Sequence, residues 1–289
     1  MTLNLNNKIG IIGMGYVGKA VYDCFKDYYS HIHTYDIDET KSNCDSIDQL
    51  VHQSKVIFVA LPTPMKNNGE CDTSLIFEAI SKINFISNEE KIIVLKSTVP
   101  PGTTEKLNKI NNNISICFNP EFLTEKNFIN DFKNQDRIIL GGDFAEITLI
   151  KEMYKSIFKS IPIIITEPKV AETVKYLTNC FLALKVIFAN EIKELCDTAD
   201  INYDLVVKYA ILDSRLGDSH WNVPGPDGFK GFGGTCFPKD VNALLFFANK
   251  KSVKLDLLRT AWEKNLKIRE SKDWESLIGR AVVDTLENS

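Results

Sequence analysis

Three glycines near the start of the chain, Gly13, Gly15 and Gly18, most narrowly limit what it can fold into. They follow a short apolar run at residues 8–12 and precede a stretch with helical character that extends to about residue 28. In such a strand–turn–helix unit the first glycine permits a tight turn, the second lets a diphosphate approach the backbone, and the third lets helix and strand pack closely. The spacing alone is a weak signal, but its place between a strand and a helix predicts a dinucleotide-binding βαβ unit.

Asp36 ends the next predicted strand and is the expected ribose contact of this unit. A carboxylate there accepts hydrogen bonds from a ribose 2′-hydroxyl and repels a 2′-phosphate, which favours NAD over NADP. Asp36 could also be an ordinary turn residue, but the glycines favour the cofactor contact. Tyr16 and Val17, at the start of the helix between the glycines, belong to the same predicted site.

Seven short apolar runs separated by helical stretches make up the first part of the chain. This alternation predicts βαβ units and a parallel sheet covered on both faces. We therefore expect an α/β fold whose residues 1–167 form a Rossmann-type, doubly wound, NAD-binding domain. The apolar runs lie at residues 8–12, 32–36, 56–61, 92–95, 114–118, 137–141 and 161–166.

The pattern changes at Pro168, where one long amphipathic helix is predicted to begin and to run to about residue 199. Proline suits the first turn of a helix, and apolar residues recur from here in steps of three and four. Further helices are predicted at 204–213, 240–250 and 253–269, so residues 168–269 form an all-helical second domain. Residues 270–289 are predicted to be a polar tail. The apolar steps fall at residues 170, 174, 177, 181, 184, 188, 192 and 195.

Composition argues against several classes of function. The net charge is −4 without a long basic run, which argues against nucleic acid as the main partner. No apolar stretch reaches the ~18 residues of a membrane span, and the N-terminus lacks the features of a secretory signal. Seven cysteines without a CxxC pair fit reduced thiols better than disulfides or a zinc site. We therefore expect a cytoplasmic protein without a structural metal.

The segment from Gly231 to Asp240 carries the strongest chemical signal. Its sequence is GFGGTCFPKD, in which glycines permit close approach, Cys236 is a potential nucleophile, and Lys239 and Asp240 can hold phosphate or move protons. A cysteine by itself is more often a buried core residue. The neighbouring charges and glycines favour chemistry here.

Four more polar clusters lie at the predicted carboxyl ends of strands or on the long helix. In an open parallel sheet, ligands bind at the carboxyl ends of the strands. Glu121 and Glu125 would share a face if Glu121 began a helical turn, and Lys175 and Asn179 are also four residues apart. Singly, these residues could be solvated charges or caps. The clusters are residues 62–64, 96–98, 119–125 and 175–179.

These segments together resemble the UDP-glucose/GDP-mannose dehydrogenase family. The matching stretches, in order, are GIIGMGYVG, LPTP, KSTVPPGTT, FNPEFLTE, KYLTNCFLALKVIFANEI and GFGGTCFPKD. The resemblance implies oxidation of a sugar CH2OH to a carboxylate with two NAD+ in turn, through a thiohemiacetal and a thioester on a cysteine. The implied substrate is a nucleotide sugar, with UDP-glucose favoured and GDP-mannose second.

The resemblance also implies roles for individual residues. Cys236 would be the nucleophile, Lys175 would stabilise oxyanions with Asn179 as partner, and either Asp240 through water or Lys175 would be the base. Thr98 would hold water, and Glu125 would assist thioester hydrolysis near the nicotinamide. Thr63 and Lys239 would lie at the cofactor. The residues implied at the sugar and its diphosphate are Glu121, Phe122, Leu123, Gly231, Phe232, Gly233 and Gly234.

The match has limits, and alternatives stay open. Most family members carry a third, nucleotide-binding domain, and residues 270–289 cannot form one, so a short form without it is implied. The helical domain resembles the family's dimerisation unit, and Val186, Ile187 and Ala189 beyond the main stripe suggest a homodimer. A β-hydroxyacid dehydrogenase is a second enzyme class, though it needs no catalytic cysteine. A non-catalytic NAD-binding partner subunit is a third hypothesis.

Overall fold

The structure is a computed structural model that describes residues 8–111, 113–142 and 144–284. Residues 1–7, on which the expected lack of a secretory signal rests, and residues 285–289 of the predicted tail lie outside the described part. The described chain divides into two compact units. The first holds residues up to Thr63 together with Thr73–Lys175, and the second holds Pro64–Asp72 together with the residues from Tyr176 onward.

Among the described residues, seven strands form one sheet in the first unit, in the order β2-β1-β3-β4-β5-β6-β7. Neighbours pair in parallel except β5 and β6, which meet antiparallel at Phe118 and Gly141. The predicted α/β fold is confirmed, with this one antiparallel pair as the departure from a fully parallel sheet. The strands are β1 (Ile9–Ile12), β2 (Ile32–Tyr35), β3 (Val56–Val59), β4 (Lys91–Leu95), β5 (Ile114–Phe118), β6 (Ile138–Gly141) and β7 (Ile163–Thr166).

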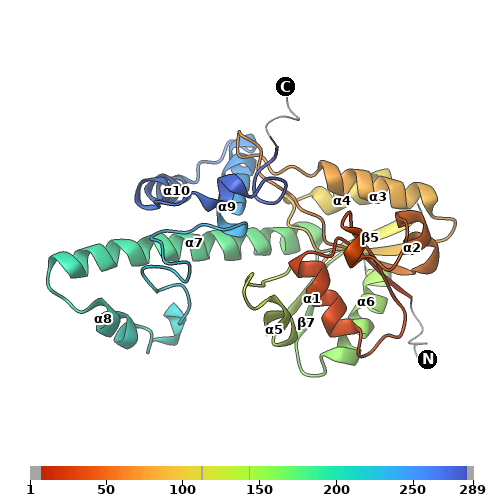
Figure 1. Ribbon diagram of the computed structural model, residues 1–289, viewed down its shortest axis with the longest axis horizontal. Helices are drawn as coiled ribbons and strands as arrows, with labels where there is room; N and C mark the ends of the chain where they lie inside the picture. Colours follow the sequence, from red (N-terminus) through yellow and green to blue (C-terminus); the bar gives the residue numbers. More distant parts are fainter. Residues whose placement is uncertain (1–7, 112, 143, 285–289) are drawn as a thin grey trace. The chain divides into compact units, whose positions relative to one another are not determined.

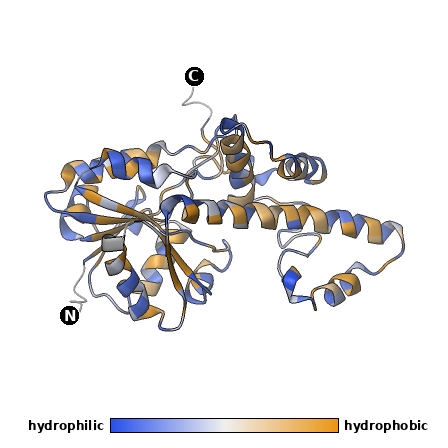
Figure 2. Ribbon diagram, turned by 180° about the vertical axis from the view of Figure 1, so that it is seen from behind, coloured by the Kyte–Doolittle hydropathy of each residue, from blue (hydrophilic) through white to orange (hydrophobic). Residues whose placement is uncertain are grey.

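Helices cover both faces of this sheet (Figure 1). Successive strand residues point to opposite faces, so Ile11 and Ile12 enter two different hydrophobic clusters. Most residues of the strands are accordingly apolar and buried, and the strands are largely orange in Figure 2. One face is covered by α1 (Tyr16–Phe25), α5 (Phe128–Lys133) and α6 (Phe144–Ile157), and the other by α2 (Ile47–Gln53), α3 (Ser74–Ile86) and α4 (Thr103–Ile110).

The second unit is helical. Its core joins the middle of α7 (Pro168–Thr198) to α9 (Cys236–Lys250) and α10 (Asp256–Ile268) through apolar residues that include Ala183, Val241 and Leu258. The remaining elements of this unit are α8 (Tyr203–Ala210) and two short 3-10 helices, η2 (Ser214–Leu216) and η3 (Asp273–Ser276); the first unit has η1 (Glu39–Lys41).

The segment after α10, read from sequence as a polar tail, contributes to this core. Trp274 is only 2% exposed and packs against Trp262, with ring centroids 5.5 Å apart. Met65 pairs with the same segment, because its N–H donates to Ala281 and its carbonyl accepts from Val283. Scattered apolar residues in a mostly polar stretch therefore suffice to bury this segment.

Much of the apolar stripe on the long helix α7 is exposed, although Val174 and Leu184 of this stripe pack against the hydrophobic clusters. Leu177, Phe181, Phe188 and Leu195 of the predicted stripe are between 53% and 63% exposed. Buried positions on the helix include polar ones, and Ile187 and Ala189, predicted to face a second chain, are buried in this one. The expectation for these two residues is therefore wrong. Helical periodicity identifies residues that share a face, but it does not say which face is inside.

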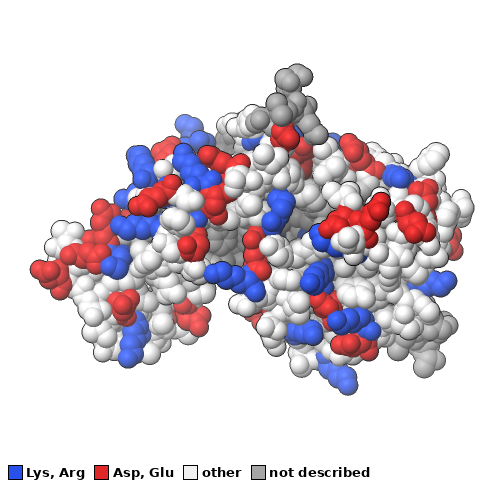
Figure 3. All heavy atoms as spheres, in the orientation of Figure 1, with Lys and Arg blue, Asp and Glu red and all other residues white. Residues whose placement is uncertain are grey.

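Charges of both signs are interspersed on the surface shown in Figure 3, over both units. Several form exposed ion pairs, such as Lys264 with Glu194 at 3.6 Å. No described helix combines the length and the apolar character needed to cross a membrane.

Candidate functional site

The glycine turn between β1 and α1 has room for a ligand at one position only. Gly13 has a φ of +88°, and a Cβ on it would lie 2.5 Å from the carbonyl oxygen of Ala60. A Cβ on Gly18 would lie 1.9 Å from the carbonyl oxygen of Gly13, so helix and strand touch there. A Cβ on Gly15 would meet nothing within 4 Å. The open side of the turn thus lies at the N-terminus of α1, where Tyr16 begins the helix and free N–H groups favour an anion.

The carboxylate of Asp36 accepts a hydrogen bond from this turn. Its Oδ2 accepts a hydrogen bond of 2.6 Å from the Met14 N–H, and its Oδ1 accepts one of 2.9 Å from the Asp38 N–H. The carboxylate therefore connects the end of β2 to the glycine turn, a structural role that sequence reasoning missed. Both its place and its charge fit a ribose contact beside an NAD diphosphate.

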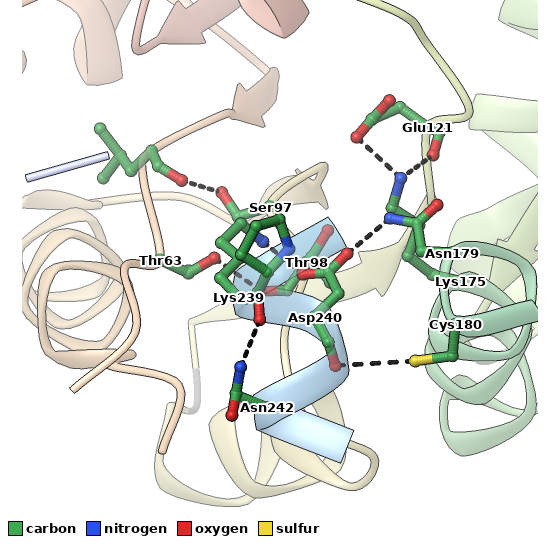
Figure 4. Close-up of polar contacts among 12 residues, drawn as sticks. Thr63, Ser97, Thr98, Glu121, Lys175, Asn179, Cys180, Lys239, Asp240 and Asn242 are labelled. Carbon is green, nitrogen blue, oxygen red and sulfur yellow. Dashed lines mark hydrogen bonds and ion pairs between the residues drawn. The ribbon is translucent and has the colours of Figure 1, made fainter. Parts of the chain in front are cut away.

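The carboxyl ends of β3 and β4 are tied together by hydroxyl groups (Figure 4). Thr63 Oγ1 donates to the carbonyl oxygen of Thr98 at 2.8 Å, and Ser97 Oγ donates to that of Leu61 at 2.6 Å. Thr63 and Thr98 are both less than 10% exposed. Two predicted site residues from neighbouring strands therefore lie side by side.

Glu121 and Lys175 form a buried ion pair in the first unit. Lys175 Nζ lies 3.0 Å from Glu121 Oε1 and 2.6 Å from the Glu121 carbonyl oxygen, and the side chains are 3% and 10% exposed. Burial alone would raise the pKa of Glu121, but Lys175, the Leu123 N–H and Lys96 outweigh it, so this pKa is lowered. Lys175 also lies 5.5 Å from the centroid of the Phe122 ring.

Glu125 does not share a helical face with Glu121. Residues 119–124 have no helical structure, and Glu125 lies in an exposed turn before α5. The condition for a shared face, a helical turn beginning at Glu121, is therefore not met. Glu121 instead folds back to accept the Leu123 N–H at 2.7 Å.

Lys96 lies in the predicted cluster 96–98, but the sequence analysis assigned it no role of its own. It follows β4 and is 3% exposed, and its Nζ donates to Asn119 Oδ1 at 2.8 Å. Tyr154 donates to the same oxygen. Burial lowers the pKa of Lys96 from 10.5 to about 7, and the positive charge of Lys175 adds a smaller lowering. The negative charge of Glu121 raises this pKa but does not outweigh burial. Its position directly before Ser97 and Thr98 is the signal that could have revealed it.

A second polar cluster lies in the helical unit around Asp240, which is 1% exposed (Figure 4). Its Oδ2 accepts from Asn179 Nδ2 and its Oδ1 from Lys239 Nζ, both at 2.5 Å. Burial alone would lower the pKa of Lys239, but Asp240 and the nearby cysteines Cys236 and Cys71 raise it overall. The carboxylate is thus held from α7 and α9 at once.

Cys236 is the first residue of α9 and is partly exposed, whereas the other six cysteines are buried. The N-terminal end of a helix favours negative charge, which suits an anionic nucleophile. Lys239 and Asp240 lie one turn further along the same helix. Accessibility therefore distinguishes Cys236 from the other thiols of the chain.

The glycine-rich loop before Cys236 presents backbone rather than side chains. Gly231 and Gly234 have φ values of +69° and +71°. The Phe232 side chain, expected near the substrate, is 4% exposed and packs against Trp262 and Phe237 in the core. The Phe232 side chain is therefore a core residue and does not face a ligand.

The predicted site residues fall into two groups, one in each unit. The first unit holds the cofactor turn, the hydroxyls and the Glu121–Lys175 pair, and the second holds Asn179, the glycine-rich loop and the cysteine helix. The first group is Gly13, Gly15, Tyr16, Val17, Gly18, Asp36, Thr63, Thr98, Glu121, Phe122, Leu123, Glu125 and Lys175, and the second is Asn179, Phe232, Gly233, Gly234, Cys236, Lys239 and Asp240.

Comparison with known proteins gives matches over both units. The NAD-binding domain of the UDP-glucose/GDP-mannose dehydrogenase family matches residues 41–162, and the central domain of that family matches residues 169–267. The match to an NAD-binding domain supports NAD as the cofactor.

Individual proteins that are similar to this chain are UDP-glucose dehydrogenases. The chain is 32% identical to UDP-glucose 6-dehydrogenase of Bacillus subtilis over 91% of its own length, and 31% identical to that of Rhizobium meliloti over 88%. It spans only 63% and 66% of those two proteins. A UDP-glucose dehydrogenase structure from Pyrobaculum islandicum superposes with a TM-score of 0.83 at 26% identity, covering 92% of this chain and 70% of that one.

The glycine turn predicts opposite outcomes for two valine substitutions. Gly15→Val should lower the melting temperature of the free protein only slightly, because a Cβ there would meet nothing within 4 Å, yet weaken NAD binding at least about tenfold. Gly18→Val should lower the melting temperature itself, since overpacking costs about 1–3 kcal/mol. Thermal melts with and without NAD measure both effects. A wild-type NAD-induced shift in Gly15→Val would contradict the assignment of the turn.

The lowered pKa of Lys96 predicts that the stability of the folded protein depends on pH. Because this pKa is lowered to about 7, the folded chain binds fewer protons than the unfolded chain between about pH 7 and 10, and stability should rise with pH over this range. Lys96→Met should remove that rise, which is at most ~1.4 kcal/mol per pH unit. Melting temperatures across the range are the measurement, with Lys82→Met, an exposed lysine, as control. Equal pH profiles in Lys96→Met and wild type would exclude a lowered pKa.

Proposed function

The chain belongs to the UDP-glucose/GDP-mannose dehydrogenase family, and from this membership we propose that it is an NAD-dependent nucleotide-sugar 6-dehydrogenase. The proposed reaction oxidises the CH2OH group of the sugar to a carboxylate in two steps. UDP-glucose is the proposed substrate because the similar proteins from Bacillus subtilis and Rhizobium meliloti bear its name, and GDP-mannose is the second candidate.

The exposure of Cys236 beside a buried Asp240–Lys239 pair is the observation that carries this proposal. Oxidation of an alcohol to a carbonyl needs a base and a hydride acceptor but no thiol. The reaction of a β-hydroxyacid dehydrogenase therefore would not use the exposed thiol of Cys236. A non-catalytic subunit would have no need of an accessible thiol at a helix N-terminus.

The first oxidation needs a base at the sugar hydroxyl. When bound, NAD+ supplies the hydride acceptor for each oxidation. Asp240, acting through a water, or Lys175 takes the hydroxyl proton as the C–H bond breaks. Lys175 also stabilises the developing negative charge on oxygen, and Asn179 donates a hydrogen bond in support.

The second oxidation needs the thiol, because an aldehyde has no alkoxide that can expel a hydride. Cys236 Sγ adds to the aldehyde carbon and forms a thiohemiacetal, whose loss of a second hydride gives a thioester. Water then breaks the C–S bond, which releases the acid and restores the thiol. Per sugar, two hydrides leave and one water is consumed, so the acid gains one oxygen. Thr98 holds the water and Glu125 assists its attack.

Turnover with a defined stoichiometry is therefore expected. Incubation with NAD+ and UDP-glucose should yield two NADH for each sugar consumed, measured by absorbance and by chromatography of the sugar product. Cys236→Ser should abolish formation of the acid, while Cys196→Ser, a substitution at a buried cysteine, should not. Unchanged acid formation by Cys236→Ser would refute the role of the thiol.

We also propose that the chain forms a homodimer through α7. The exposed side chains of Leu177, Phe181, Phe188 and Leu195 recur at helical spacing along one line of this helix. Exposed Leu205 and Tyr209 on α8 belong to the same unit. Exposed apolar side chains aligned on one helix in this way are typical of protein–protein contacts.

Phe181→Glu tests the homodimer. A buried unpaired charge opposes association, so this variant should be monomeric at micromolar concentration while the wild-type chain is dimeric. Light scattering after gel filtration gives the mass. Phe85→Glu alters an equally apolar residue that is 89% exposed on α3, and it should stay dimeric. A monomeric wild-type chain would refute the homodimer.

A further inference from the structure

Three side chains at and beyond the end of α10 hold the glycine-rich loop by its backbone. They are Asn265, Arg269 and Asp273, spaced four residues apart, and we call them the loop clamp. None of them belongs to the site described above. The loop residues that they contact, Gly231 to Gly234, directly precede Thr235 and Cys236.

Asn265 pairs with Phe232 as a neighbouring strand would. Its Oδ1 accepts from the Phe232 N–H at 2.8 Å, and its Nδ2 donates to the Phe232 carbonyl oxygen at 3.0 Å. Asn265 is 0% exposed, so this pairing is shielded from water. A Cβ on Gly231 would lie 2.3 Å from Asn265 Oδ1, so the contact also requires a glycine there.

Arg269 links Asp227, four residues before the loop, to Asp273 and lies against the loop at Gly233. Its Nη2 donates to Asp227 Oδ2 at 2.7 Å and to Asp273 Oδ1 at 2.9 Å, and its side chain is only 1% exposed. A Cβ on Gly233 would lie 2.1 Å from this same nitrogen. The guanidinium therefore lies directly against the loop backbone.

Asp273 completes the clamp. Its Oδ2 accepts from the Gly234 N–H at 2.8 Å, while its other oxygen is held by Arg269. Gly234 is two residues before Cys236, and its φ of +71° is a conformation that other residues rarely adopt. Fixing this amide therefore fixes the direction in which the chain enters the cysteine helix.

We propose that Asn265, Arg269 and Asp273 are positioning residues that hold the glycine-rich loop ready for the diphosphate of the nucleotide sugar and set the presentation of Cys236. This inference rests on the proposed function. The contacts restrict the conformations of the loop before substrate binds. Substrate binding therefore costs less conformational entropy. Loss of the clamp should therefore weaken substrate binding more than it slows the chemical steps.

Asp273→Ala is the main test, because this side chain is partly exposed and its loss should be tolerated. The Gly234 amide should exchange with solvent faster, by NMR, and iodoacetamide should alkylate Cys236 at a changed rate. The KM for UDP-glucose should rise about tenfold, as expected for one lost charge-assisted hydrogen bond, while kcat changes less than about threefold. Alkylation reports on Cys236 because the other cysteines are buried.

Two further variants make the test specific. Asp273→Asn keeps an acceptor for the Gly234 N–H but loses the charge opposite Arg269, so it should restore part of the wild-type exchange and KM. Arg259→Ala alters an exposed arginine on α10 and should behave as wild type. Wild-type exchange, alkylation and KM in Asp273→Ala would overturn the proposal, as would equal changes in Arg259→Ala.

Failure of the proposed function would give a different result. The wild-type protein would then produce no NADH from any nucleotide sugar, whatever the state of the loop. The exchange and alkylation measurements need no turnover, and faster exchange at Gly234 with altered alkylation in Asp273→Ala would still support the clamp. No change in either would overturn it in that case as well.

Discussion

Buried charges that must be paired organise both units of this protein. Glu121 with Lys175, and Asp240 with Lys239, place four ionisable side chains where little or no water reaches them. Removal of one partner from such a pair costs about 3–5 kcal/mol, because the other charge stays buried without compensation. Each pair is also anchored by further hydrogen bonds, from Leu123 in the first unit and from Asn179 in the second. The polar groups proposed for catalysis are therefore held in fixed positions.

The helix α7 supplies a member of each cluster. Lys175 and Asn179 are one turn apart, and both are buried although they are polar. Their burial requires that the polar side of the helix face inward, and it leaves Phe181 and Phe188 exposed on another side. The same helix thus carries catalytic candidates and an apolar surface for a second chain, which connects the proposed dimer to the proposed chemistry.

Local features of the sequence predicted most of the fold. The strands and the turn at Gly13 follow from short-range patterns, since a positive φ or a close backbone contact leaves its mark on the residue itself. The orientation of α7 was not predictable in this way, because periodicity does not distinguish the inner face from the outer one. The contacts of Arg269 with Asp227 and of Asn265 with Phe232 span 42 and 33 residues, and no local pattern signals them. Lys96 was named only within the cluster 96–98, because its hydrogen bond to Asn119, which also accepts from Tyr154, joins residues far apart in the chain.

A covalent intermediate on Cys236 is the central claim of this account. Intact-mass measurement of the protein, quenched at short times after mixing with NAD+ and UDP-glucose, tests it most directly. We expect an adduct with the mass of the nucleotide-sugar acyl group, located at Cys236 by peptide mapping, that rises and then decays as the acid accumulates. Accumulation of the acid while Cys236 stays unmodified at every time point would contradict the account.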